Sequence, residues 1–338
     1  MQELLNTVKI KPRLAFVGAG WIGLSRMKSL VDGDLCDPVA IVDPVLSNVE
    51  KAQELAPGAA SFGSLEEVIE SKPDGIVIAT PSAMHARQSI QALEKGIPVF
   101  CQKPLARTAG ESRQVIAAAE QADRLLGVDL SYRFTEGMQK TEELVRQGEL
   151  GKIYAVDLVF HNAYGPDKSW FYDPMLSGGG CLIDLGIHLV DLAMWILGFP
   201  EMTGISSSLL SKGQLLSDPL KQTEDYVSAQ FDTSGGTSVR LTCSWNLPAG
   251  KDAEIKASFY GTKAAVCFSN VNGSFYDFET VLCRGTSAEV ISVPPDDWGG
   301  KALINWTRKL EAGNTFDPEI KSYIQVAETI DRIYGRAE

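Results

Sequence analysis

Three polar side chains interrupt the apolar run of residues 178–198. If the run forms a helix, Asp184, His188 and Asp191 fall within a stripe of about 60°, because each residue turns a helix by about 100°. An imidazole one turn from a carboxylate is suited to moving a proton, since histidine titrates near neutral pH. A histidine in an apolar helix is more often a hydrogen-bonded core residue, however, and Asp184 with His188 could share a metal ion. The stripe alone leaves these three interpretations open.

A glycine-rich loop near the N-terminus has the spacing of a dinucleotide site. Gly18, Gly20 and Gly23 form a G-x-G-x-x-G pattern between a predicted strand and a predicted helix. The first glycine permits a tight turn, the second lets a pyrophosphate approach the backbone, and the third lets the helix pack closely. The chain has 31 glycines, so the strand-turn-helix context is what makes the pattern specific. We predict that the cofactor binds at Gly18, Gly20, Trp21, Ile22 and Gly23.

An acidic residue follows this loop at the position expected for ribose recognition. Asp43 ends the next predicted strand, 20 residues after Gly23. A carboxylate there accepts hydrogen bonds from the adenosine ribose and repels a 2′-phosphate, which predicts NAD rather than NADP. The alternative is an ordinary turn residue ahead of Pro44.

Two further loops, "IATPSAMHA" and "VFCQKPLA", follow buried strands and open at the same edge of the predicted sheet. Thr80, Pro81, Gln102 and Lys103 lie in them and are predicted to line the cofactor site. A lysine held between a buried strand and a proline is placed to stabilise negative charge, although most single lysines are solvated surface residues. His85 is a further cofactor-binding candidate, although packing at the start of its helix is the commoner role.

The elements that must position these loops follow from two changes in sequence pattern. Between residues 13 and 128, short apolar strands alternate with amphipathic helices, which is typical of a doubly wound parallel sheet. After residue 150, alternating strands separated by turns predict an open, mainly antiparallel sheet, and the chain ends in two predicted helices. We therefore predict an α/β Rossmann domain over residues 1–130 and an α+β domain covered by helices over residues 131–338.

Composition restricts the partners. The 31 Lys and Arg residues and 43 Asp and Glu residues give a formal charge of -12, which repels nucleic acid and anionic membranes and favours a small-molecule substrate. The six cysteines show no C-x-x-C pair, which predicts reduced thiols in a cytoplasmic protein, and with only three histidines no metal site is predicted. The N-terminus lacks a signal-peptide core and charges interrupt residues 182–199, so neither secretion nor a membrane span is predicted.

The segment "HNAYGPDKSWFYDP" lies between a predicted strand and the glycine run at residues 178–180. Its polar and aromatic residues are typical of a substrate loop, in which Tyr164 and Trp170 could stack on the apolar face of a sugar ring. The alternative is that these aromatic side chains only anchor the loop.

Taken together, "GAGWIG", "TPSAMHA", "QKPLA" and "GGGCLIDLGIHLVDL" resemble the motifs of the Gfo/Idh/MocA oxidoreductases, named for glucose-fructose oxidoreductase and inositol dehydrogenase. The resemblance extends to about residue 265. The family's E-K-P motif aligns with residues 102–104, and its D-x-G-x-H motif aligns with Asp184, Gly186 and His188. The chain departs from the pattern at Gln102, where glutamate is usual, which removes a negative neighbour of Lys103.

The resemblance implies NAD-dependent oxidation of a hydroxyl group of a sugar, a sugar derivative or a cyclitol. His188 would be the general base, Asp184 would orient it or bind a substrate hydroxyl, and Lys103 would stabilise an alkoxide. Asp191 is assigned to structure. The resemblance implies that Arg133 faces the substrate cleft, and the equally open alternative is a surface arginine that joins the two domains. The resemblance also implies a homodimer or homotetramer formed through the C-terminal sheet. Two alternatives remain, an NAD-dependent glycosidase of the same fold family and a non-catalytic nucleotide sensor.

Overall fold

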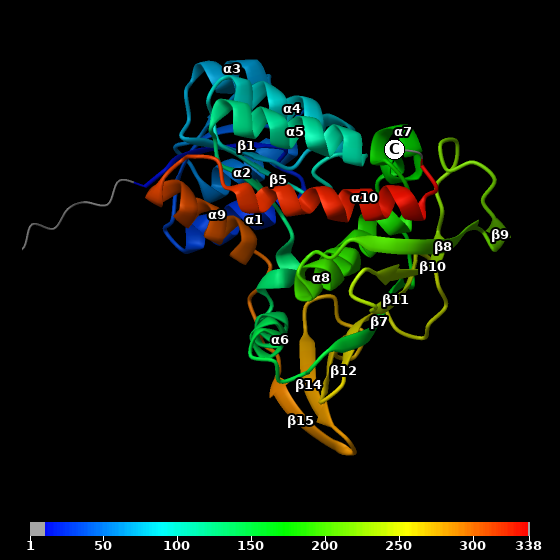
Figure 1. Cartoon of the computed structure of the whole chain (residues 1–338). Helices are drawn as coiled ribbons and strands as arrows, with labels where there is room; N and C mark the ends of the chain where they lie inside the picture. The colour runs from blue at the N-terminus through cyan, green and yellow to red at the C-terminus, as the bar shows by residue number, and fades with distance from the viewer. Residues whose placement is uncertain (1–10, 337–338) are drawn as a thin grey trace, which may run out of the picture.

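The computed structural model describes residues 11–336 (Figure 1). Its N-terminal part is a six-stranded parallel sheet in the order β3-β2-β1-β4-β5-β6. The strands are β1 (Arg13–Val17), β2 (Asp37–Val42), β3 (Ala60–Ser61), β4 (Gly75–Ile78), β5 (Val99–Cys101) and β6 (Leu126–Val128). The connecting helices are α1 (Trp21–Asp32), α2 (Leu46–Leu55), α3 (Leu65–Glu70), α4 (Ser82–Glu94) and α5 (Ala109–Ala122). The predicted doubly wound fold is confirmed.

The strand order of this sheet creates the place where a ligand can bind. Strand β1 pairs with β2 on one side and with β4 on the other. After β1 the chain continues to β2 on one side, and after β4 it continues to β5 on the other side. A crevice therefore opens between the loops that follow β1 and β4, at the carboxyl edge of the sheet. The glycine-rich loop follows β1, and the loop with Thr80 follows β4. Both predicted cofactor loops lie at this switch point.

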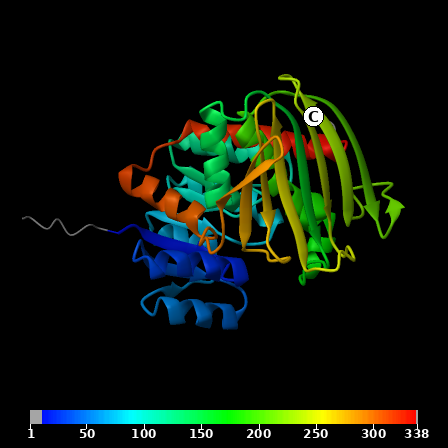
Figure 2. The ribbon, with the colours of Figure 1, turned by 90° about the horizontal axis from the view of Figure 1, so that it is seen from below.

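The second sheet has nine strands in the order β15-β14-β13-β12-β7-β11-β10-β8-β9. Its neighbouring strands are antiparallel except for β7 and β11, which run parallel, and Figure 2 shows the long strands side by side. They are β7 (Ile153–Asn162), β8 (Met202–Ser211), β9 (Gln214–Leu215), β10 (Tyr226–Thr233), β11 (Ser238–Ser244), β12 (Ala253–Gly261), β13 (Ala265–Asn270), β14 (Phe278–Arg284) and β15 (Ser287–Ser292). The predicted mainly antiparallel sheet is confirmed, and β8, β9, β14 and β15 are additions to the strands expected from the sequence.

Helices cover one face of the second sheet (Figure 1). They are α6 (Glu136–Arg146), α8 (Ile187–Leu197) and α10 (Tyr323–Ile333), and a short helix, α7 (Pro174–Ser177), precedes the glycine run. Strand residues alternate between the two faces, as in β10, where every second side chain from Val227 to Thr233 is buried. The other face carries the polar members of this alternation, including Gln230 and Arg240.

One helix of the C-terminal part belongs to the core of the first domain. In α9 (Lys301–Ala312), the buried Leu303, Trp306 and Leu310 join a cluster that contains Leu14 and Phe100. Figure 1 shows α9 beside α1. The domain boundary near residue 130 stays a prediction. Beyond this boundary, α9 returns to pack against the first domain.

The helical segment Pro174–Leu197 is long and apolar enough to cross a membrane by length and composition alone. In this fold, 78 % of its most apolar window is buried. A helix that is apolar on all sides is expected in the interior of a large domain. We therefore describe α8 as the core helix of the second domain.

Candidate active site

The glycine-rich loop has the geometry that the dinucleotide pattern predicts. Gly18 has a φ of +93°, and a Cβ there would lie 2.5 Å from the carbonyl oxygen of Ala79. A Cβ on Gly23 would lie 2.1 Å from the carbonyl oxygen of Gly18, so this residue lets α1 pack against the loop. A Cβ on Gly20 would have no heavy atom within 4 Å. Gly20 therefore leaves open space directly before the first turn of α1, where backbone N–H groups can receive a phosphate.

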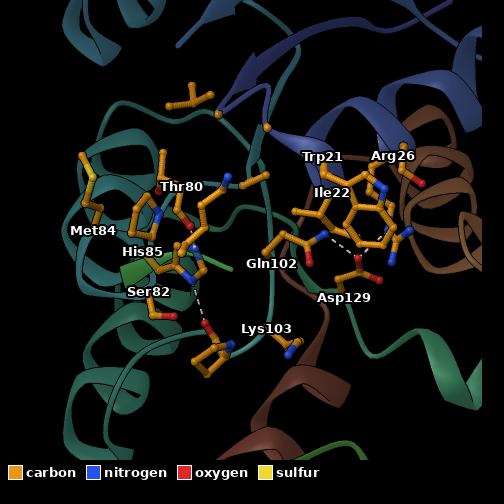
Figure 3. Close-up of a pocket in the computed structure, with 18 of the residues that line it drawn as sticks. Trp21, Ile22, Arg26, Thr80, Ser82, Met84, His85, Gln102, Lys103 and Asp129 are labelled. Atoms are coloured by element: carbon orange, nitrogen blue, oxygen red, sulfur yellow. Dashed lines mark hydrogen bonds and ion pairs between the residues drawn. The ribbon is translucent and has the colours of Figure 1, made fainter. Parts of the chain in front are cut away.

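A cavity of about 1160 Å³ extends from this loop to the second domain. Its volume exceeds the range of about 300–1,000 Å³ that is usual for small-ligand pockets, which suits a dinucleotide and a substrate together. The predicted cofactor residues that line it are Gly18, Gly20, Trp21, Ile22, Asp43, Thr80, Pro81, His85, Gln102 and Lys103. Figure 3 shows several of them around the opening.

Asp43 organises the loop at the ribose end of the cavity. Its Oδ2 accepts a hydrogen bond from the backbone N–H of Ala19 (2.8 Å), and its Oδ1 accepts from the backbone N–H of Val45 (2.9 Å) and from Asn48 Nδ2 (3.1 Å). Each carboxylate oxygen has two lone pairs. One acceptor position on Oδ2 therefore remains for a ligand hydroxyl.

His85 joins the two loops at the carboxyl edge. Its Nε2 lies 2.7 Å from the carbonyl oxygen of Thr80 and its Nδ1 lies 2.7 Å from that of Pro104. Burial lowers the pKa of this imidazole below its ordinary value. The side chain therefore fixes the loop that carries Lys103, and a direct contact with the cofactor stays a prediction.

Lys103 meets the helix of the second domain through an ion pair. Its Nζ lies 2.8 Å from Asp184 Oδ1 and donates to the backbone carbonyl of the same residue (2.6 Å). The second carboxylate oxygen of Asp184 accepts a hydrogen bond from Trp245 Nε1 (3.2 Å). Both members of the pair line the cavity. The structure thus brings together the two motifs that are separated by 81 residues in the sequence.

His188 lines the same cavity one turn farther along the helix. Its ring lies against Tyr132, with the ring centroids 4.8 Å apart, and its Nδ1 is buried without a hydrogen-bond partner among the described residues. Burial, and secondarily the positive charges of Lys103 and Arg26, hold the pKa of His188 well below its ordinary value. The imidazole is therefore neutral at physiological pH and able to accept a proton.

The start of this helix departs from the regular α-helix assumed for the polar stripe. Residues Leu182–Gly186 form a π-helical turn before α8 begins at Ile187. Turns of this kind are frequent at functional sites because they redirect side chains. Asp184 and His188 line the cavity, whereas Asp191 does not.

The glycine run before the π-turn is required by close packing. A Cβ on Gly179 would lie 2.0 Å from Tyr334 Oη, and one on Gly180 would lie 1.9 Å from the carbonyl oxygen of Glu224. The buried Glu224 carboxylate accepts hydrogen bonds from the N–H groups of Gly180 (3.0 Å) and Leu182 (2.9 Å) and from Tyr334 Oη (2.8 Å). Burial raises the pKa of Glu224. This carboxylate caps the helix that carries Asp184 and His188.

Gln102 belongs to a buried polar network that the sequence did not reveal. Its Nε2 donates to Asp129 Oδ2 (2.5 Å), and Arg26 Nε donates to the same oxygen (2.6 Å), as drawn in Figure 3. Ser131 donates to the other oxygen of Asp129. Asp129 is 1 % exposed and Gln102 is 6 % exposed. Gln102 therefore has a buried carboxylate beside it, although the usual glutamate is absent from its own position. This carboxylate belongs to Asp129, which directly follows β6.

Two predicted substrate residues do not line the cavity. Arg133 donates from Nε to Asp191 Oδ2 (2.8 Å), and its guanidinium lies over the rings of Trp195 and Phe199. A buried carboxylate thus holds Arg133 away from the cavity, and a contact of Arg133 with the substrate stays a prediction. This ion pair is the kind of structural role assigned to Asp191. Tyr164 is 50 % exposed and packs on Phe275.

Trp170 does line the cavity, where its ring stacks on Phe171. Three aromatic residues that the sequence reasoning missed, Phe275, Tyr276 and Trp298, line it as well. Phe275 and Tyr276 lie in the loop between β13 and β14, and Trp298 lies in the loop before α9. Neither loop contains a recognisable sequence motif. Within residues 11–336, no group of three or more His, Cys, Asp or Glu side chains is placed to hold a metal ion.

The fold and the site define a Rossmann-type oxidoreductase with a separate substrate-facing domain. Residues 12–130 match the oxidoreductase family with an NAD-binding Rossmann fold, and residues 138–267 match the GFO/IDH/MocA C-terminal domain. The chain belongs to the Gfo/Idh/MocA family.

Relatives in this family act on sugars and cyclitols. D-glucoside 3-dehydrogenase of Escherichia coli (strain K12) is 30 % identical over 265 residues, 75 % of each chain. The scyllo-inositol 2-dehydrogenase (NAD(+)) of Bacillus subtilis (strain 168) is 26 % identical over 82 % of this chain and 79 % of its own. The crystal structure of KijD10, a 3-ketoreductase from Actinomadura kijaniata in complex with NADP and TDP-benzene, has a TM-score of 0.82 at 18 % identity, over 97 % of this chain and 98 % of that one. This protein is a dehydrogenase of CH–OH groups by its family, and its fold is compatible with either NAD or NADP.

Proposed function

We propose that the protein oxidises a secondary hydroxyl group of a sugar or a cyclitol, with NAD as the hydride acceptor and His188 as the general base. The observation that carries this proposal is the meeting of His188, Lys103 and Asp184 in one cavity with the glycine-rich loop. The three side chains come from both domains, so a substrate between the domains can contact all of them.

His188 has the protonation state that a general base needs. Its lowered pKa keeps the imidazole neutral, and its Nδ1 is buried, so Nε2 is the nitrogen left to accept the proton of a substrate hydroxyl. A bound NAD supplies the acceptor for the hydride that leaves the same carbon. Loss of one proton to His188 and of one hydride to the nicotinamide would balance the oxidation of an alcohol to a ketone.

Lys103 and Asp184 act together on the substrate oxygen. The Lys103 ammonium group is fixed by two contacts with Asp184, so its third N–H remains for a hydroxyl whose oxygen becomes negative as the proton leaves. Asp184 is in turn fixed by Trp245. A fixed donor stabilises developing charge without having to reorganise during the reaction.

Asp43 supports NAD over NADP. A 2′-phosphate would approach a carboxylate whose position is fixed by three hydrogen bonds. We expect NAD to bind at least about tenfold tighter than NADP, which corresponds to about 1.4 kcal/mol. Titration calorimetry of both dinucleotides measures this ratio, and equal affinities would contradict the assignment.

The role of His188 is tested by His188→Ala in a screen of sugars and cyclitols for NAD reduction. We expect kcat to fall by about 10²- to 10⁴-fold, the usual contribution of general acid–base catalysis, with little change in NAD affinity. Lys103→Ala is expected to be severe, and the double variant less impaired than the product of the two effects. His161→Ala is the matched control, because His161 bonds to Ser244 on the second sheet and does not line the cavity.

Stability separates catalysis from packing in this experiment. If His188 only filled the core, its replacement would lower the melting temperature and leave kcat per folded molecule unchanged. A stable His188→Ala variant with undiminished kcat would contradict the assignment of His188 as the general base.

We also propose that subunits associate through the uncovered face of the second sheet, as a homodimer or a homotetramer. Polar and apolar residues alternate along β11 and β12, so the face of the sheet that no helix covers carries their outward side chains. Such a face can be exposed to water or packed against a second subunit, and we propose the second. A cytoplasmic location stays a prediction from the six free cysteines.

A further inference from the structure

We propose that the substrate is an electrically neutral sugar or cyclitol, one that carries no phosphate, nucleotide diphosphate or carboxylate group. The inference rests on the proposed dehydrogenase function and names its substrate class. It follows from how the charged side chains of the cavity wall are paired and from what the rest of the wall is made of.

The two cations deepest in the cavity wall are already neutralised. Arg26 is paired with Asp129 at 2.6 Å, and the two side chains are 9 % and 1 % exposed. Lys103 is paired with Asp184 at 2.8 Å, and the proposed mechanism uses this pair. A substrate phosphate that took either cation would leave a buried carboxylate without its partner, which is costly.

The two other cations among the described lining residues are also poorly placed to bind a substrate phosphate. Lys168 forms an ion pair with the neighbouring Asp167 (3.1 Å) and is 66 % exposed at the side chain. Arg87 lies on α4 in the first domain, on the same helix as His85 and Gln88. The second domain's wall therefore offers a single cation, and that cation is solvated and paired.

Carboxylates exceed cations among the cavity-lining residues that follow residue 130 in the chain. Asp296 is paired with Lys301 (2.5 Å) and accepts the backbone N–H of Glu136. Asp297, the next residue, also lines the cavity and has no ion-pair or hydrogen-bond partner among residues 11–336. A phosphorylated substrate would meet this carboxylate without a compensating cation, and like charges brought together at a binding surface oppose binding. The dinucleotide's own phosphates avoid this conflict because they meet the first turn of α1 instead.

The rest of this wall is suited to an uncharged ring. Trp170, Phe171, Phe275, Tyr276 and Trp298 present aromatic surface to the cavity. Trp298 is held in place by a hydrogen bond from its Nε1 to the carbonyl oxygen of Tyr276 (2.9 Å). Aromatic faces bind the C–H face of a sugar or cyclitol ring, while the polar groups at Lys103 and His188 bind its hydroxyls.

The test compares matched pairs of compounds on the NAD-loaded enzyme: D-glucose with glucose 6-phosphate, methyl glucoside with the glucuronide, and an inositol with its monophosphate. We expect kcat/KM for the neutral member to exceed that of the charged member by about 100-fold or more in each pair that reacts. A phosphorylated or acidic compound that reacts better than its neutral partner would overturn the inference and leave the dehydrogenase proposal standing. If no compound of any pair reacts while NAD still binds, both proposals fail together.

A charge-reversed variant tests the cause of the selectivity. Asp297→Lys should raise kcat/KM for the phosphorylated compounds by about tenfold or more while changing the neutral compounds less. Glu54→Lys on α2 is the matched control, because it makes the same change of charge on an exposed residue outside the cavity. An equal effect of both variants would show that net charge, and not the cavity wall, sets the preference, which would overturn the inference.

Discussion

Gln102→Glu is the substitution that best tests the polar network beside Lys103. The family's usual residue at this position is glutamate, so on motif alone the change should be harmless. In this structure it replaces the N–H that Gln102 donates to Asp129 with a second carboxylate at a distance of about 2.5 Å. Because Asp129 is 1 % exposed, water cannot separate the two charges. We therefore expect the change to be destabilising.

The size of the effect follows from two competing costs. Two like charges about 3 Å apart repel by about 5 kcal/mol at an effective dielectric constant of about 20. The new carboxyl group can avoid this by staying protonated, at about 1.4 kcal/mol for each pH unit above its ordinary pKa of about 4.3, or about 3.7 kcal/mol at pH 7. Arg26 offsets part of either cost because it already contacts Asp129. We expect a loss in unfolding free energy of about 2–4 kcal/mol near pH 7 and about 1 kcal/mol near pH 5.5.

The sign of the pH dependence is fixed by where the proton binds. The folded variant holds a proton that the unfolded chain releases above a pH of about 4.3, so the variant becomes less stable as the pH rises. Urea unfolding of the wild-type and variant proteins at two pH values measures this directly. Gln88→Glu is the matched control, because Gln88 Oε1 accepts a hydrogen bond from Thr80 (2.6 Å) in the same cavity wall and a carboxylate can accept it equally well.

A second substitution shows whether the two side chains act as a pair. Adding Asp129→Asn to Gln102→Glu returns the number of charges to that of the wild type and lets the new amide donate to the new carboxylate. We expect this double variant to recover most of the lost stability. Two results would contradict the proposed contact between Gln102 and Asp129. One is a Gln102→Glu variant as stable as the wild type at both pH values, and the other is a double variant no more stable than the single variant.

Three further predictions concern the helix cap, the base and the assembly. Glu224→Gln should lower the unfolding free energy by about 1–3 kcal/mol and should lower kcat, because its amide nitrogen must face an N–H or O–H donor at the start of the helix that carries Asp184 and His188. Unchanged stability in urea unfolding would contradict the cap. Since the pKa of His188 is lowered, kcat/KM for oxidation should hold its plateau through pH 6.5 and fall only at lower pH as the imidazole gains a proton, and an acid limb at or above 6.5 would contradict the neutral base. Light scattering at micromolar concentration should give a dimer or tetramer mass, and a monomer mass would count against association through the second sheet.

The fold could be predicted where local pattern and global topology agree. The buried strands β1, β4 and β5 are short apolar runs next to glycine or proline, so their place at the centre of a parallel sheet follows from the sequence. Strand β8 was missed because only the first residue of this serine-rich strand is buried, and β15 was missed because it lies at the sheet edge with most of its side chains in solvent. The alternation that marks a half-buried strand is weak in both.

The residues of the candidate site that stand in sequence motifs could be predicted, and those that stand outside any motif could not. Lys103 and Asp129 both follow strands at the carboxyl edge, yet only Lys103 stood in a motif that distinguished it from an ordinary turn residue. The position of Arg133 outside the cavity could not be predicted, because its partner, Asp191, is 58 residues away and only the packing of α8 brings the two together. Phe275 and Trp298 reach the cavity from loops whose sequence has no feature of its own. Contacts of this range depend on the whole fold.

The polar stripe in an apolar helix is stable because each of its members is satisfied differently. Asp191 is 2 % exposed at the side chain, and its charge is matched by Arg133 at 2.5 Å. Asp184 faces the cavity, where Lys103 and Trp245 bond to its two oxygens. His188 needs no counter-ion, because burial keeps it neutral. A core helix can therefore keep an acid, an imidazole and a second acid only if a cation from another element approaches each acid. One of these cations, Lys103, belongs to the other domain, so the requirement for a neutral core also brings Lys103 to the cavity that His188 lines.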